Sequence, residues 1–188
     1  MKENPITIGF DDATFSLRSN SKKTTELIGI VCQGVRMVNA VRTPITIDGD
    51  DATEALITLI KLNEKHVQYV LTDTITFAGF NIYDINEVYE KTGKPIIAIT
   101  EREIGLDSVK KALIKKFPNT YKNKFQKIIN AGNLYQTELN TAGGLTKIYF
   151  HFKGIEVKKI ESLLSKICID SKLPECVRLA HILGRIIY

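Results

Sequence analysis

The sequence predicts an α/β fold whose mixed sheet consists of three antiparallel strands followed by β-α-β units. Apolar side chains alternate along residues 6–47, as in half-buried strands, whereas helical stripes and short apolar runs alternate from residue 52 onward. The chain has 188 residues, of which 44% are hydrophobic and 25% charged, and this suits one compact domain with a full core. We therefore expect a single domain over residues 1–188.

The composition argues against a membrane or secreted protein. No apolar run reaches the ~18 residues of a membrane span, and the first residues lack the apolar core of a signal peptide, so we expect a cytoplasmic location. Cys32, Cys168 and Cys176 lie in apolar segments without a zinc-binding spacing, as reduced core thiols do. The 26 basic and 21 acidic residues give a net charge of +5, which is compatible with a nucleic-acid partner.

The first three strands are predicted from alternation and from the lengths of their connections. Residues 6–11 alternate apolar with small or polar side chains, and residues 27–35 and 37–47 are β-branched and apolar. Almost no linker separates the second and third segments. A connection this short must be a hairpin, because a parallel return needs a crossover of a dozen or more residues. These segments are therefore expected to be antiparallel neighbours.

The middle of the chain alternates helices with buried strands. The apolar period changes from two to 3.6 at Ala52, where a first helix begins, and residues 69–73 form a short apolar run typical of a buried parallel strand. Residues 84–92 predict a second helix that ends at Gly93, and residues 96–99 predict a further buried strand. The middle is therefore expected to be β-α-β-α-β.

The last third adds helices and a hairpin. Two helices are predicted over residues 108–117 and 121–131, and two strands over residues 133–139 and 147–152 flank a turn, as in a hairpin appended to one sheet edge. Two closing helices follow, the second beginning at Pro174. This order of elements is the ribonuclease H-like order.

Three acids stand where this topology would gather them at one sheet edge. Asp11 lies on the first strand, Asp51 precedes the first helix, and Asp73 ends the fourth strand. Clustered carboxylates bind Mg²⁺ or Mn²⁺ well, and two such ions ~3.5–4 Å apart can activate water for phosphodiester cleavage. We therefore predict these three residues as metal ligands and catalytic residues.

Two of these acids also have a structural alternative. Asp51 and Glu54 fit a helix capping box, as Asp84 and Glu87 do, and Asp73 fits an Asx turn at the end of a strand.

Neighbouring acids leave part of the assignment open. The middle acid could be Asp48 or Asp50 instead of Asp51. Alternation favours Asp11 over Asp12, because Asp11 shares a face with Gly9, whose missing side chain leaves room for a ligand. Asp12 is expected to point to the opposite side.

Three further segments suggest contacts with nucleic acid. Phe77, Phe80 and Asn81 lie around Gly79, directly after Asp73, and suit a base turned out of its stack, although both rings also suit the core. The segment 110–127 carries seven lysines and no acid, so it suits a phosphate backbone or a solubilising face. Its members include Lys115 and Lys116, which we predict as nucleic-acid contacts.

The final helix carries Arg178, His181 and Arg185 on one face. We predict that Arg178 and His181 meet the scissile phosphate or orient the attacking water, the alternative for His181 being a hydrogen bond at the sheet edge.

Four motifs together resemble the endonuclease dU family, a largely archaeal family formerly described as a domain of unknown function and related to endonuclease V. The motifs are Gly9-Phe10-Asp11-Asp12, Gly49-Asp50-Asp51-Ala52-Thr53, Thr76-Phe77-Ala78-Gly79-Phe80-Asn81 and Arg178-Leu179-Ala180-His181. The resemblance covers nearly the whole chain. It implies a ribonuclease H-like fold and a metal-dependent endonuclease acting on DNA that carries a deaminated base such as uracil.

The resemblance to endonuclease V also implies roles for single residues. Asp11 sits where that enzyme has its first-strand Gly-x-Asp, and Asp73 where it has the aspartate that ends strand four. Its middle acid is a glutamate seven residues after a proline, and here Asp51 stands seven residues after Pro44. Two departures are Thr74 in place of a glycine, and Arg42-Thr43-Pro44 in place of a Tyr-x-Pro-Gly wedge.

We therefore expect a Mg²⁺- or Mn²⁺-dependent endonuclease that nicks DNA near a deaminated base in DNA repair, with water as the nucleophile. The DNA is expected to be damaged or single-stranded. The alternatives are a nucleic-acid-binding module without a metal site, and a nuclease of the same fold that acts on RNA or branched DNA. No oligomeric state is predicted.

Overall fold

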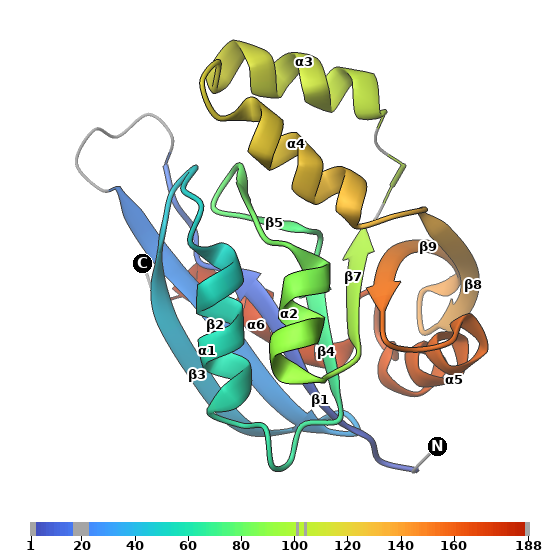
Figure 1. Cartoon of the computed structure of the whole chain (residues 1–188). Coiled ribbons are helices and arrows are strands. Elements are labelled where there is room, and N and C mark those ends of the chain that lie inside the picture. The colour runs from blue at the N-terminus through green and yellow to red at the C-terminus, as the bar shows by residue number, and fades with distance from the viewer. Residues whose placement is uncertain (1–2, 17–22, 101, 104, 187–188) are drawn as a thin grey trace.

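The computed structural model describes residues 3–16, 23–100, 102–103 and 105–186. Within them, seven strands form one mixed sheet in the spatial order β3-β2-β1-β4-β7-β9-β8 (Figure 1). The strands of this sheet are β1 (Ile6–Asp12), β2 (Thr24–Gln33), β3 (Arg36–Thr46), β4 (Tyr69–Asp73), β7 (Ile96–Thr100), β8 (Tyr135–Thr141) and β9 (Gly144–Lys153).

The strand directions confirm the predicted fold class. β1, β2 and β3 are antiparallel neighbours, β1, β4 and β7 run parallel, and the β8–β9 hairpin pairs antiparallel to β7 at one edge. Phe10 of β1 stands in register with Thr72 of β4. The next residue of each strand is an aspartate, so Asp11 and Asp73 reach the same end of the sheet at the same level.

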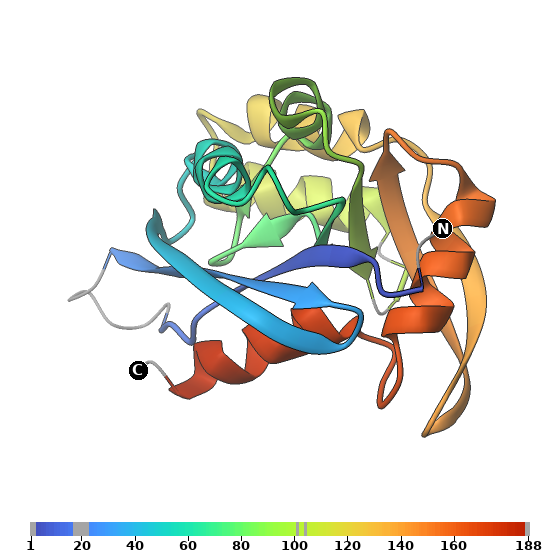
Figure 2. The ribbon, with the colours of Figure 1, turned by 90° about the horizontal axis from the view of Figure 1, so that it is seen from below.

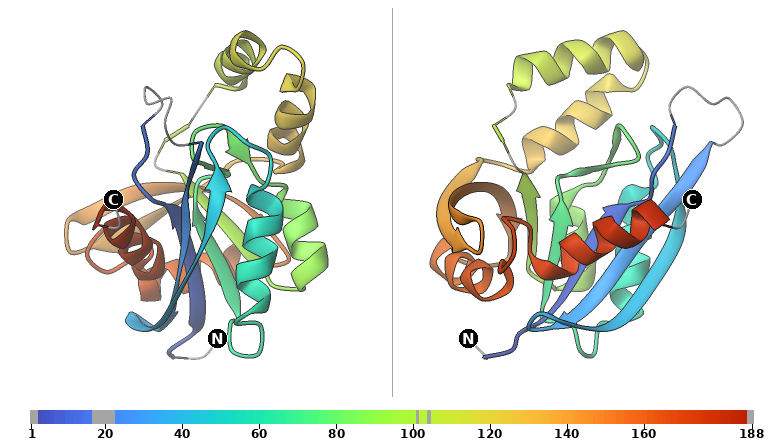
Figure 3. Two further views of the ribbon diagram at one scale, coloured as in Figure 1. Left: turned by 90° about the vertical axis from the view of Figure 1, so that its left-hand side faces the viewer. Right: turned by 180° about the vertical axis from the view of Figure 1, so that it is seen from behind.

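Helices cover both faces of the sheet (Figures 2 and 3). On one face, α1 (Ala52–Lys61) and α2 (Ile85–Thr92) bury an apolar cluster that includes Ile8 and Phe10. On the other face, α5 (Val157–Ile167) and α6 (Glu175–Ile186) bury a second cluster that includes Ile28 and Ile30. The alternation of each strand therefore sends successive side chains into two different cores.

The remaining elements gather near the carboxyl ends of the central strands. The helical hairpin of α3 (Leu106–Lys116) and α4 (Tyr121–Asn130) stands beyond those ends, separate from the helices on the two sheet faces (Figure 1). The segment that follows Asp73 folds into a small hairpin of β5 (Thr76–Phe77) and β6 (Asn81–Ile82).

Helix α6 packs unusually close to β1 because a glycine stands at each of two contact points. A Cβ on Gly9 would lie 2.4 Å from the backbone carbon of Cys176 and the nitrogen of Val177, and one on Gly184 would lie 2.7 Å from the Asp12 carbonyl oxygen. The expectation that Gly9 leaves room for a ligand is therefore wrong, since helix backbone fills that space. The two contacts fix α6 along β1.

Two predictions on the chain as a whole can be compared with this fold. Cys32, Cys168 and Cys176 are buried free thiols, as expected, and burial raises the pKa of Cys32 to about 12. Among the described residues, no helix is both long and apolar enough to span a membrane.

Candidate metal centre and nucleic-acid surface

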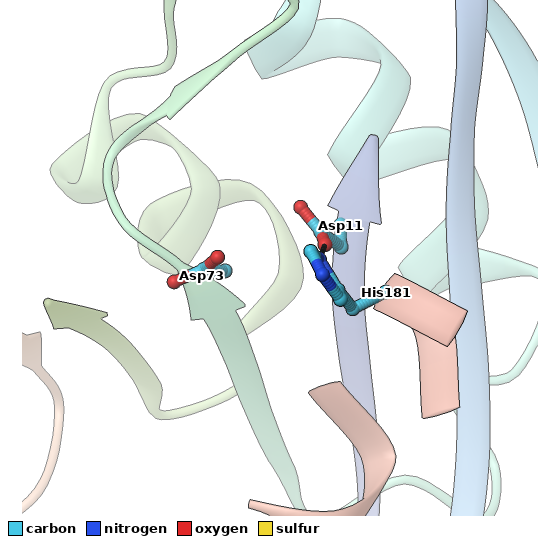
Figure 4. A group of neighbouring side chains, drawn as sticks. All are labelled: Asp11, Asp73 and His181. Atoms are coloured by element: carbon cyan, nitrogen blue, oxygen red, sulfur yellow. Dashed lines mark hydrogen bonds and ion pairs between the residues drawn. The ribbon is translucent and has the colours of Figure 1, made fainter. Parts of the chain in front are cut away.

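Three side chains from distant parts of the chain meet where β1 and β4 end. Asp11, Asp73 and His181 each offer a ligand atom, and these atoms lie within 4.8 Å of one another. Figure 4 shows Asp11 on β1, Asp73 at the end of the neighbouring β4 and His181 entering from α6. Of the three acids expected to gather, Asp11 and Asp73 lie in this group, and His181 stands where Asp51 was expected as the third member.

Local packing explains this arrangement. The β1–β4 register sets the two aspartates side by side, and the contacts at Gly9 and Gly184 hold α6 on either side of His181. The backbone N–H of Thr14 also donates to the Gly184 carbonyl oxygen at 3.0 Å, which ties the end of α6 to the segment after β1. The histidine is therefore placed by backbone contacts as well as by its own side chain.

Asp11 is a buried carboxyl group, with 7% of the residue exposed. Its Oδ2 lies 2.6 Å from His181 Nδ1, and its Oδ1 accepts the backbone N–H of Asp12 at 2.8 Å. Burial, reinforced by the nearby charges of Asp73 and Asp12, raises the pKa of Asp11 to about 7, although the His181 hydrogen bond acts in the opposite direction. A bound cation would offset this concentration of negative charge.

Asp12 lines the same surface cavity as Asp11, although its carboxylate is hydrogen-bonded to a different segment of the chain. Its Oδ2 accepts the backbone N–H of Ala78, and burial raises the pKa of its carboxyl group. A shallow cavity of about 390 Å³ covers the centre, and Asp12 lines it together with Asp11, Thr14, Phe15, Asp73, Thr74, Thr76, His181 and Arg185. Sequence alternation did not predict that Asp12 would share a cavity with Asp11.

Thr74 adopts a left-handed backbone conformation, with φ of 62°, at the position where a glycine was expected. A β-branched residue rarely adopts this conformation. The Thr74 hydroxyl accepts the backbone N–H of Thr76 at 3.0 Å, which holds the turn that leads away from Asp73. The absence of glycine is therefore accommodated by a local hydrogen bond.

The prediction that Asp51 completes the metal centre needs correction. Asp51 does not belong to the acidic group, because its carboxylate accepts from the Thr46 N–H, the Thr46 hydroxyl and the Asn81 amide. The capping alternative fails too, since no hydrogen bond joins the Asp51 side chain to the first turn of α1. The other candidates for the middle acid are paired with lysines: Asp48 with Lys116 and Asp50 with Lys127, each at 2.6 Å.

Two of the three predicted base contacts are structural residues. Phe77 is 1% exposed and stacks on Tyr83, their ring centroids 5.7 Å apart. Asn81 is fully buried, its Oδ1 accepting the Ala52 N–H and its amide nitrogen donating to the Thr46 carbonyl oxygen. Neither can meet a base without unfolding the segment, so these two predictions are wrong.

Phe80 remains available because it lines a second, larger and mainly apolar cavity of about 870 Å³. This cavity lies between the β5–β6 segment, the end of β7 and the α3–α4 hairpin. Thr74 and Thr76 line both cavities, so the larger cavity adjoins the acidic centre. Other residues that line it include Ala98, Leu106, Val109, Ile128, Asn133, Leu134 and His151.

On α6, two arginines differ in their position relative to the acidic cavity. Arg178 lies near the start of the helix, where its guanidinium donates two hydrogen bonds to the Glu175 carboxylate, at 2.8 and 2.7 Å. It does not line the acidic cavity, whereas Arg185 does. Arg178 therefore lies away from the cavity where it was predicted to meet the scissile phosphate, and Arg185, on the same helix face, lines that cavity.

The lysine-rich segment separates into inward and outward members. Lys124 is 3% exposed, whereas Lys116 pairs with Asp48 but keeps 39% of its side chain exposed and stays a predicted nucleic-acid contact. Lys115 is exposed on α3 and stays a predicted backbone contact. A run of like charge does not reveal this division, because it depends on which faces of α3 and α4 meet the acidic loop 48–50.

Comparisons with known proteins agree with this architecture. The family model described as "Endonuclease dU" matches residues 6–188. A UPF0215 protein of Pyrococcus horikoshii is 34% identical over 186 residues, covering 98% of this chain and 92% of the relative.

Two solved structures extend the comparison. A protein of unknown function from Archaeoglobus fulgidus has a TM-score of 0.83 and 26% identity, covering 97% of this chain and 98% of its own. Ciona intestinalis endonuclease V was solved in complex with a 24mer DNA containing an inosine followed by a ribo-adenosine. Its TM-score is 0.58 at 13% identity, and the match covers 94% of this chain and 82% of the endonuclease V chain. At that identity the likeness shows a shared fold.

Proposed function

Because this chain belongs to the endonuclease dU family, we propose that it is a divalent-metal-dependent endonuclease that nicks DNA carrying a deaminated base such as uracil. The observation that carries the proposal is the meeting of Asp11, Asp73 and His181 at the end of the central strands. The fold shared with endonuclease V supports it, because that enzyme is a nuclease solved on inosine-containing DNA.

The donor set suits a hard or borderline divalent ion. The two carboxylates supply oxygen ligands, which Mg²⁺ prefers and Mn²⁺ accepts. The raised pKa of Asp11 reflects burial and like charge that a cation would relieve. When bound there, the ion would supply a water of lowered pKa and neutralise charge on the phosphate.

The protein side chains would divide the remaining work. Asp11 and Asp73 would hold the ion, and the Asp11 carboxylate fixes the His181 ring through Nδ1. Among the described residues nothing is hydrogen-bonded to His181 Nε2, so this nitrogen can take a proton from the attacking water or give one to the leaving oxygen. Arg185, at the rim of the same cavity, would bind a phosphate oxygen.

The larger cavity is the proposed site for the damaged base. An enzyme that inspects a base in a duplex must turn it out of the stack, and an apolar cavity with an aromatic wall suits its face. Phe80 supplies that wall beside the acidic centre. The exposed Lys115 on α3, beyond the same end of the sheet, is proposed to hold the backbone.

The proposal can be tested with matched oligonucleotides. Single-stranded and duplex DNA with one uracil, one inosine or no lesion would be incubated with Mn²⁺ or Mg²⁺, beside an RNA of the same sequence and a four-way junction. Nicking of the uracil strand that depends on the metal and is lost in Asp11→Asn, but kept in the exposed control Asp107→Asn, supports the proposal.

Other results identify the alternatives. Faster cleavage of the RNA or of the four-way junction than of the uracil-containing DNA would indicate a nuclease of the same fold with that substrate. Salt-dependent binding that ignores the metal and leaves every strand intact indicates a non-catalytic nucleic-acid-binding module.

A further inference from the structure

Lys124 of α4 is a charged side chain in an almost fully buried position, 3% exposed. Its ammonium group donates to the carbonyl oxygens of Phe80 at 2.8 Å, Asp48 at 3.3 Å and Gly49. These three oxygens belong to two separate loops, residues 48–49 and residues 78–80. One buried cation therefore joins both loops to the α3–α4 hairpin.

The two loops are also bonded directly to each other. The Asp48 N–H donates to the Ala78 carbonyl oxygen at 2.8 Å, and the Phe80 N–H donates to Asp48 Oδ1 at 2.9 Å. Gly79, between them, has φ of +87°, and a Cβ there would lie 2.5 Å from Asp48 Oδ1. Loop 78–80 is therefore held both by these bonds to loop 48–49 and by the Lys124 ammonium group.

Loop 78–80 in turn lines the larger cavity and is hydrogen-bonded to a residue that lines the acidic cavity. The Ala78 N–H holds the carboxylate of Asp12, the residue next to Asp11 in the acidic centre. Gly79 and Phe80 form part of the wall of the larger cavity. A shift of this short loop would therefore change the acidic centre and the proposed base site together.

We infer that Lys124 is a positioning residue: by binding three loop carbonyl oxygens, it fixes loop 78–80 and so sets the acidic centre relative to the apolar cavity. The inference rests on the proposed function in so far as it assigns those two cavities to cleavage and base binding. It also assigns the acidic loop 48–50 the role of a scaffold for the hairpin.

The test compares Lys124→Met, which keeps the apolar stem and removes the ammonium group, with Lys122→Met, an exposed lysine on the same helix. Three quantities are measured at a temperature where both variants are folded: kcat and KM for the uracil oligonucleotide, Mn²⁺ affinity by calorimetry, and hydrogen exchange of the amides of residues 78–80. A merely structural lysine would lower the unfolding temperature and leave all three unchanged.

We expect Lys124→Met to lose about tenfold or more in kcat/KM, through both kcat and KM, because small displacements of reacting groups are costly. Mn²⁺ binding should weaken, exchange at Ala78 and Phe80 should accelerate, and Lys122→Met should match the wild type in Mn²⁺ affinity and exchange. A folded Lys124→Met with wild-type exchange, Mn²⁺ affinity and kinetics would overturn the inference.

A second variant decides the matter if Lys124→Met does not fold. Gly79→Ala disturbs the same loop without touching the lysine, because the added methyl group meets Asp48 Oδ1. The same changes in exchange and Mn²⁺ affinity support the inference, and their absence overturns it. If the wild-type protein nicks no substrate, the proposed function fails, but exchange and Mn²⁺ binding still decide the positioning role.

Discussion

His181 Nδ1 lies 2.6 Å from Asp11 Oδ2, although 170 positions separate the two residues in the chain. The contact depends on glycines at positions 9 and 184, which allow α6 to approach the backbone of β1. The acidic centre is thus a product of tight helix–strand packing at the end of a mixed sheet. Because Asp11 is buried by this packing, its charge state affects the stability of the whole protein, and both can be followed in one unfolding experiment.

Removing the Asp11 charge should stabilise the metal-free protein at alkaline pH. The pKa of Asp11 is raised from 3.8 to about 7, so the folded state binds its proton more tightly, and stability falls as pH rises from about 4 through about 7. Asp11→Asn escapes that loss and should unfold several degrees above the wild type at pH 8, a gain of about 1–2 kcal/mol. At pH 4 this advantage should disappear.

Saturating Mn²⁺ should reverse the order at pH 8, because only the wild type gains binding energy. Thermal unfolding with and without Mn²⁺ measures both effects. A metal-free variant less stable than the wild type at pH 8 would contradict the assigned charge state.

Mn²⁺ affinity should depend on pH through the same group. Since the ligand must be deprotonated, binding displaces the Asp11 proton below pH 7. Calorimetric affinity should rise by up to about tenfold per pH unit from pH 5.5 to 7 and then level off. Repeating the titration in buffers of different ionisation enthalpy should reveal proton release at pH 6. Affinity that stays constant over this range would count against Asp11 as a ligand.

Asp51→Ala should weaken the fold and spare the metal centre. It removes the acceptor of the Thr46 N–H and hydroxyl and of the buried Asn81 amide, which should cost about 1–2 kcal/mol. The expected result is a lower unfolding temperature with Mn²⁺ affinity within twofold of the exposed control Asp107→Ala. Loss of Mn²⁺ binding in a folded Asp51→Ala would restore Asp51 as the middle acid.

Arg185 and Arg178 should differ although they share a helix face. Arg185→Ala removes the cation at the acidic cavity, so KM for DNA should rise and the salt slope of binding should fall by about one. Arg178→Ala breaks a pair with Glu175 and should leave both quantities near the wild type. Fluorescence anisotropy from 50 to 200 mM salt measures the slope. Equal effects of the two substitutions would argue against this assignment.

Local patterns predicted most of the fold, and the failures have a common cause. Asp84 and Asp51 are each followed by a glutamate three residues later, yet only Asp84 caps its helix, accepting from the Asn86 and Glu87 amides. Around Asp51, the competing donors Thr46 and Asn81 come from other segments. Spacing within one segment carries no information about such partners.

In the candidate site, too, residues placed by a regular element were predictable, and residues placed by contacts with other segments were not. Asp11 and Asp73 were predictable because strand register alone brings them level, and His181 because a helix face repeats. Asp12 and Lys124 were not, since their roles depend on the loop 78–80 that lies between them. Phe77 and Phe80 are aromatic residues three positions apart, yet Phe77 is buried whereas Phe80 is partly exposed and lines the larger cavity.

The most direct test of the central claim is a crystal structure of the protein soaked with Mn²⁺ and measured at a wavelength where manganese scatters anomalously. The account predicts an anomalous peak bonded to carboxylate oxygens of both Asp11 and Asp73, absent in crystals of Asp11→Asn. An empty site at saturating Mn²⁺, or a peak at the acidic loop 48–51 instead, would contradict it.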